Sequence, residues 1–189
     1  MNNRKHIEIA LFTAGAIVLT LFTIPLPGFS FLQLDLSVVL IYLIFSRVGV
    51  KAGYFSLFIT MAFNAFLKGL VAFGIGQISY IIAFLLFYYF FKYLNKKSNR
   101  LNINAIITTI LMMIFMTIFN YFIITPLYAI AFGGNISDTI IFSFPDTYFN
   151  KEYFIFIVAL YPAFNFIQWG INISIITAIT KAINRENRL

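Results

Sequence analysis

The sequence contains no cysteine and only one histidine, His6, in 189 residues. The lack of cysteine excludes disulfide bonds, thiolate nucleophiles and cysteine-ligated metals. A single histidine at the basic N-terminus leaves no cluster for a metal centre or a catalytic triad. Aspartate and glutamate are also scarce, with six in total. We therefore expect neither enzymatic activity nor a required cofactor.

Charge is rare as well, because only 10% of the residues are charged and 61% are hydrophobic. A soluble domain has about a quarter of its residues charged and about half apolar. No polar stretch is long enough to build a soluble domain. The composition therefore predicts an all-α integral membrane protein, in which residues 1–189 form a single membrane domain.

Six apolar segments are candidate membrane spans, since a span takes roughly 20 apolar residues. They are Ile7–Ile24, Leu36–Phe45, Tyr54–Ala72, Ile78–Tyr93, Ile103–Ala131 and Tyr153–Ile183. The second is short and either continues through Val50 or does not cross fully. The first imitates a signal peptide, but its apolar run exceeds the usual length of a signal core. We interpret it as an uncleaved helix.

The charge distribution supports six spans with both termini in the cytoplasm. In that arrangement 11 of the 13 lysine and arginine residues lie inside, and only Lys68 and Lys151 lie outside. Four of the six acids fall outside. This follows the positive-inside rule, and a five-span arrangement breaks it. We therefore interpret the net charge of +7 as membrane topology and expect no nucleic-acid partner.

The outer connections contain turn formers and one long loop. Residues 25–35 include Pro25, Pro27 and Gly28, which prevent helix continuation. Asp35, followed by Ser37, is a plausible cap for the second helix. The connection from 132 to 152 is the longest, and loops of this length often act as lids or binding loops.

Uncharged amides are the main polar groups inside the spans. Gln77, Asn120, Asn165 and Gln168 are all expected near the outer ends of spans four to six. Amides both donate and accept hydrogen bonds, which suits a heteroaromatic ring with imide and carbonyl groups. Surrounding aromatic side chains, including Trp169, suit a flat ligand. The same amides also suit hydrogen bonding between helices, and the residues alone leave both readings open.

The segment from Asn120 to Tyr128 places an amide, Thr125 and Pro126 inside one of the longest apolar runs. Polar groups at membrane depth are costly unless they pair or line a cavity. This segment is therefore either a helix contact or the wall of a ligand site. Pro126 is expected to loosen the last helical turns.

Small residues recur in the first span, where Ala10 and Ala14 are four positions apart. Small residues on one face allow another helix to approach closely. The partner is either another helix of the same chain or a separate protein.

Several of these strings resemble one family, the substrate-capture S components of energy-coupling factor vitamin importers, and in particular the riboflavin-binding (RibU) type. The resemblance covers nearly the whole chain. It is carried by Ala10-x-x-x-Ala14, Phe31-Leu-Gln-Leu-Asp35, Gly49-Val-Lys-Ala-Gly53, Gly74-Ile-Gly76-Gln77, Asn120-Tyr-Phe…Pro126-Leu-Tyr128 and Phe164-Asn165.

The resemblance implies six transmembrane helices with outer loops over a ligand site, in the bacterial cell membrane. It implies riboflavin as the transported ligand. It also implies two kinds of partner, a transmembrane coupling subunit and two ABC-type ATPase subunits. Ala10 and Ala14 would form the docking face. The candidate ligand-binding residues are Asn120, Asn165, Gln168, Gln77, Tyr128, Phe29, Phe31 and Leu40.

Two positions depart from the family pattern, since Gln168 stands where a lysine is expected and Gln77 where a glutamate is common. An S component for another vitamin or precursor, such as thiamine, pantothenate or a pyridoxine-like compound, is therefore the main alternative. A membrane assembly protein without a ligand and a membrane-embedded lipid enzyme are further alternatives.

Overall fold

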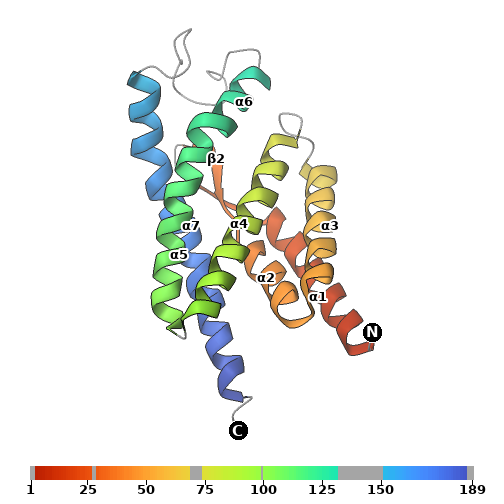
Figure 1. The fold of residues 1–189 in the computed structure, drawn as a ribbon. Coiled ribbons are helices and arrows are strands. Elements are labelled where there is room, and N and C mark those ends of the chain that lie inside the picture. Colours follow the sequence, from red (N-terminus) through yellow and green to blue (C-terminus); the bar gives the residue numbers. More distant parts are fainter. Residues whose placement is uncertain (1–2, 27–28, 69–73, 99, 132–150, 187–189) are drawn as a thin grey trace.

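The computed structural model describes residues 3–26, 29–68, 74–98, 100–131 and 151–186. Within them the chain forms six helical rods and one β-hairpin (Figure 1). The elements are α1 (Asn3–Leu21), β1 (Ile24–Leu26), β2 (Phe29–Leu34), α2 (Ser37–Arg47), α3 (Val50–Lys68), α4 (Ile75–Lys97), α5 (Leu101–Phe119), the π-helix η2 (Asn120–Ile124), α6 (Thr125–Ala131) and α7 (Lys151–Glu186).

The rods are arranged in two groups that α4 joins. Helices α1, α2 and α3 pack against one another, and α5 packs against both α4 and α7. Both chain ends and the α4–α5 turn lie at one end of the molecule, whereas α6 lies at the opposite end (Figure 1). We call these the terminal end and the hairpin-side end. This arrangement agrees with termini on one side of a membrane, although the side itself stays a prediction.

In the part of the chain that the structure describes, four helices are long and apolar enough to cross a membrane. They span Val50–Leu67, Ile75–Lys97, Leu101–Tyr128 and Phe154–Arg185. Helix α1 has the length of a span but begins with charged residues, and α2 has only 11 residues. The expectation that the second segment is short is confirmed. Each helix begins and ends within four residues of the predicted segment, and the differences of four are at the start of α1, at both ends of α3 and at the end of α4.

The fold is mostly helical, and the first outer connection contains a β-hairpin that was not predicted. Strands β1 and β2 pair antiparallel, with Ile24 opposite Leu34 and an irregularity after Pro25. The hydroxyl of Thr23 donates to Oε1 of Gln33 at 2.6 Å, next to the strand pairing. The prolines and glycine that excluded a helix left an extended segment free to pair. Most of the predicted loop 132–152 lies outside the described residues.

The main core is aromatic. Phe45, Phe84, Phe87 and Phe91 are almost fully buried and stack with the ring of Tyr42 or with one another. Trp169 of α7 joins them, with its ring 5.3 Å from that of Phe87. Because aromatic pairs prefer tilted and edge-on contacts, this cluster fixes α2, α4 and α7 against one another.

Close helix packing depends on two glycines at the α2–α3 corner. Gly49 has a φ of +133°, which side chains disfavour, and it lets α3 start directly after α2. A Cβ atom at Gly53 would lie 2.2 Å from the Phe45 ring. Larger residues at Gly53 would therefore push α3 away from α2.

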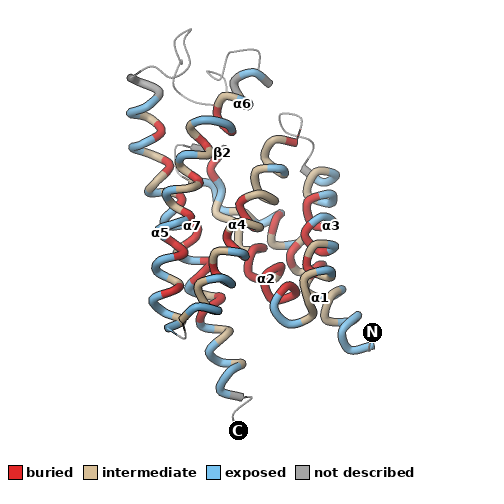
Figure 2. Tube along the Cα trace, in the orientation of Figure 1, coloured by how far each residue is buried: buried red, intermediate tan, exposed pale blue. Residues whose placement is uncertain are grey.

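The outward faces of the bundle are apolar. Figure 2 shows that exposed residues run along the outer faces of the helices while buried ones face their neighbours. Phe66 is 83% exposed and Ile106 is 61% exposed. Exposing these apolar side chains to water would be unfavourable, whereas contact with lipid tails is not.

Candidate functional site

A second apolar cluster lies where the hairpin meets α7. Leu32 of β2 packs with Ile157 and Tyr161 of α7, and Leu26 and Tyr121 close around them. The hairpin is therefore seated on the first half of α7 and on η2. This cluster separates the hairpin-side end from the aromatic core and borders the predicted ligand-binding residues.

The chain is not a regular α-helix at Asn120–Ile124, where it forms the π-helix η2. Proline has no N–H, and its ring clashes with the carbonyl four residues earlier in an α-helix. Pro126 follows this turn, and the N–H of Thr125 bonds the carbonyl of Asn120 five residues back. The wider turn accommodates the proline, and single π-turns are frequent at functional sites.

Asn120 is buried at the start of this turn, and its amide nitrogen donates to the Met116 carbonyl at 2.6 Å. Thr125 at the other end of the turn is also buried, and its hydroxyl lies 3.2 Å from the hydroxyl of Tyr161. The π-turn and α7 are thus joined by a polar contact as well as by apolar packing.

Four buried polar residues form one row on α7, which we call the amide row. They are Tyr161, Asn165, Gln168 and Asn172. Their spacings of four, three and four positions place them on one face of the helix. The amide row faces the π-turn and the end of the hairpin, because its members contact Thr125 and Asp35.

Asn165 is 3% exposed, and its Nδ2 atom has no hydrogen-bond partner among the described residues. An unsatisfied buried donor costs about 1–3 kcal/mol. Such a group therefore calls for an explanation, and a ligand acceptor would provide one. In the same row Asn172 Oδ1 is also buried without a partner among the described residues, but it is an acceptor, whereas Asn165 Nδ2 offers a donor.

Gln168, in contrast, is engaged with the backbone of Asp35. Its Oε1 accepts from the Asp35 N–H at 3.1 Å, and its Nε2 donates to the Asp35 carbonyl at 2.9 Å. Asn172 Nδ2 donates to the same carbonyl at 3.0 Å. We call these three bonds the Asp35 clasp. Sequence reasoning missed Asn172 as a partner, although its spacing from Gln168 indicated a shared face.

The Asp35 clasp also fixes the start of α2. The Asp35 carboxylate accepts from the backbone N–H of Ser37 at 2.7 Å, as the predicted cap requires. The Ser37 hydroxyl lies 2.5 Å from the Tyr80 hydroxyl of α4. Residues from the hairpin, α2, α4 and α7 therefore meet around one aspartate.

Gln77 lies at the first turn of α4 and contacts a different neighbour. Its Nε2 donates to Oδ1 of Asn64 in α3 at 3.1 Å, while its Oε1 has no partner among the described residues. Tyr128 of α6 reaches the same turn, because a Cβ atom at Gly76 would lie 2.9 Å from its hydroxyl. The structure thus brings Tyr128 to the turn that carries Gln77.

The remaining predicted ligand-binding residues lie elsewhere or are described only in part. Phe29 and Phe31 are in β2, and their side chains lie outside the described part of the chain. Leu40 packs on α1, since a Cβ atom at Gly15 would lie 2.8 Å from its Cδ1. No contact among the described residues brings Leu40 to the amide row.

The predicted docking residues Ala10 and Ala14 are both exposed on α1. The neighbouring face of α1 is buried, where the Thr13 hydroxyl lies 2.8 Å from that of Ser56 in α3. The small residues therefore do not serve packing within the described chain, and they leave a shallow face open to another helix.

Comparison with known proteins identifies the family. The family model described as "ECF transporter, substrate-specific component" matches residues 4–180. The chain belongs to this family. Its members are transport subunits rather than enzymes, and they work with a membrane coupling subunit and ATPases. The chain is accordingly a multi-pass protein of the cell membrane.

A solved structure described as "Structure and mechanism of the S component of a bacterial ECF transporter" is similar throughout. The identity is 25%, the TM-score is 0.69, and the match covers 98% of each chain. A search of curated proteins found no match. This substrate-specific component therefore has both the sequence pattern and the fold of an S component.

Proposed function

We propose that this S component binds riboflavin at the amide row and passes it to an ATP-driven importer. The observation that carries the proposal is the buried Asn165 amide, whose donor has no partner among the described residues. The isoalloxazine ring presents carbonyl acceptors and an imide donor. Asn165 Nδ2 can donate to a ring carbonyl. Gln77 Oε1, which has no partner among the described residues, can accept from the imide N–H.

The surroundings support a flat aromatic ligand that is only weakly charged. The residues bordering the amide row include Tyr121, Phe156 and Phe164. Aromatic side chains with a few polar groups are typical of ligand pockets. We further propose six membrane spans with both termini in the cytoplasm, so that the hairpin-side end faces outward and receives the vitamin.

The role proposed for Gln168 differs from direct ligand contact. Both ends of its amide bond Asp35, so in this conformation it positions the hairpin beside the ligand. A neutral amide pairs with a peptide group more readily than a lysine does, because it offers both a donor and an acceptor. This explains how a departure from the family pattern is compatible with ligand binding.

The experiment is purification of the full chain in detergent, followed by riboflavin titration. Quenching of flavin fluorescence should saturate with one ligand per chain, at submicromolar concentration. Mass spectrometry of the heat-released ligand identifies what the cell supplied. If the chain does not bind riboflavin at micromolar concentration and a different vitamin co-purifies with it, that vitamin becomes the proposed substrate. No ligand at all would instead favour an assembly role.

A further inference from the structure

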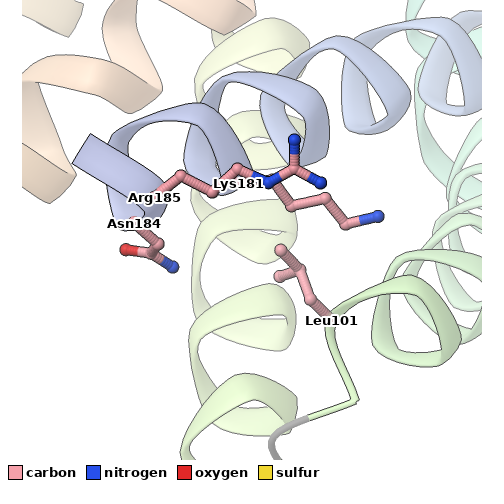
Figure 3. Close-up of a pocket in the computed structure, with 4 residues that line it drawn as sticks. All are labelled: Leu101, Lys181, Asn184 and Arg185. Carbon is pink, nitrogen blue, oxygen red and sulfur yellow. The ribbon is translucent and has the colours of Figure 1, made fainter. Parts of the chain in front are cut away.

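A pocket at the terminal end is lined by basic residues that the riboflavin proposal does not use. It lies between the start of α5, at Leu101, and the last turns of α7, which contribute Lys181, Asn184 and Arg185 (Figure 3). Its volume is about 330 Å³. It is at the opposite end of α7 from the hairpin (Figure 1).

The two cations lie together and have no counter-ion among the described residues. Lys181 and Arg185 are four positions apart, so they share a face of α7. Figure 3 shows both side chains extending in the same direction over Leu101. The ion pairs that the structure describes join Glu8 to Arg4 and Arg47. Like charges at this spacing disfavour the helix, and an anion between them reverses that effect.

The position of the pocket in the bundle indicates where an anion would come from. The apolar span of α7 ends at Arg185, so the pocket lies where the hydrophobic part of the helix ends. Helix α5 then presents Ile103, Ile106 and Ile110 as exposed side chains in the turns after Leu101. The apolar span of α5 begins at Leu101, so the cationic groups lie at the level where the apolar parts of α5 and α7 both end, which is where phospholipid headgroups lie in a bilayer.

We propose that this pocket binds the phosphate-bearing headgroup of an anionic phospholipid. The Arg185 guanidinium supplies a planar fork that matches phosphate oxygens, and Lys181 supplies a point charge. The Asn184 amide adds a neutral donor. Basic pockets between helices on the cytoplasmic side are a known form of lipid headgroup recognition. The basic turn Lys96, Lys97 and Arg100 adds positive charge on the same side of the membrane.

Native mass spectrometry of the detergent-solubilised full chain tests the proposal, with phosphatidylglycerol and phosphatidylcholine as probes. The wild type should retain phosphatidylglycerol in preference to phosphatidylcholine. The double variant Lys181→Gln/Arg185→Gln should bind phosphatidylglycerol roughly 30-fold more weakly, from two cations near the membrane surface. The matched control Lys5→Gln/Lys51→Gln removes the same charge from exposed sites on α1 and α3 and should change binding little.

A charge-preserving variant, Lys181→Arg/Arg185→Lys, should keep most of the lipid binding. It shows whether a loss of binding in the glutamine variant comes from the lost charge or from misfolding. Equal binding of both lipids, or equal losses in the pocket and control variants, would overturn the proposal. A competition experiment with inorganic phosphate distinguishes a lipid headgroup from free phosphate. Displacement of phosphatidylglycerol by millimolar phosphate would show a site for free phosphate and would overturn the lipid assignment. Loss of assembly with the coupling subunit, without loss of lipid, would make the pocket a protein contact instead.

Discussion

Helix α1 carries its small residues on an exposed face, whereas α7 carries its amides on a buried one. Ala10 and Ala14 leave room on the surface of the bundle, and Asn165 and Gln168 lie inside it. An exposed groove suits a second protein, and a buried donor suits a small ligand. The difference teaches that the predicted docking face and the proposed ligand site lie on separate helices, so mutations should be able to disrupt the two functions separately.

The largest effect is expected on transport from Ala14→Trp. A bulky ring on this face would prevent the close approach of a coupling helix. Tryptophan is the largest side chain, so the upper end of the roughly 1–3 kcal/mol cost of overpacking applies, and uptake should fall by about 100-fold or more while riboflavin binding stays unchanged. Radiolabelled uptake and fluorescence quenching measure the two activities. Ile114→Trp on the exposed face of α5 is the matched control and should leave both intact. Normal uptake by Ala14→Trp would remove the docking role of this face.

The second-largest effect is expected on riboflavin affinity, from Asn165→Ala in the buried amide row of α7. Loss of a hydrogen bond to a buried ligand acceptor costs about 1–3 kcal/mol, so the Kd should rise by roughly 10- to 100-fold. Because Nδ2 has no partner in the described chain, Asn165→Ala breaks no described bond of this donor and removes its desolvation penalty, so the unfolding free energy without ligand should not fall. Titration and denaturant unfolding measure the two quantities.

Asn102→Ala, on the exposed surface of α5, is the matched amide control for Asn165→Ala. It should affect neither quantity. A drop in stability without any loss of binding would show that Asn165 holds helices together rather than a ligand.

The smallest effect is expected from Gln168→Leu, which breaks two of the three bonds of the Asp35 clasp. Each bond contributes about 0.5–1.5 kcal/mol, so exchange of the hairpin amide hydrogens should become roughly tenfold faster. Ligand dissociation should accelerate to a lesser degree. Hydrogen–deuterium exchange of residues 29–34 measures the first quantity. Asn172→Leu removes one bond to Asp35 and should have a smaller effect; unchanged exchange in both would contradict the positioning role.

The fold was predictable where one property decided it. Uninterrupted apolar segments fixed the helices, and Asp35 before Ser37 indicated the cap that the structure contains. The hairpin was not predictable from the same signals, because Pro25 and Pro27 exclude a helix without requiring strands. The fold is mostly helical, and the hairpin is an addition to it that the sequence signals did not indicate.

The sequence was enough to predict which residues are polar and share a face at the site, but not which groups they contact. The polarity of Asn165 and Gln168 and their spacing on one face were visible in the sequence. That Gln168 pairs with a peptide 133 positions away was not visible, because tertiary contacts of this length leave no local pattern. Leu40 packs against α1 in the structure, and its predicted contact with the ligand stays a prediction.

The π-turn at Asn120–Ile124 has a consequence for which insertions and deletions the chain tolerates. Such a turn carries about one more residue than an α-helical turn, so it acts as a one-residue insertion whose excess is absorbed locally. Deleting a residue within it would restore a regular helix and leave the orientation of α6 nearly unchanged. Deleting one residue elsewhere in α5 would rotate all that follows by about 100°. Differences in length among relatives should therefore be concentrated at this turn. Asn120 is the first residue of the turn, so a deletion there would change the surroundings of this buried amide.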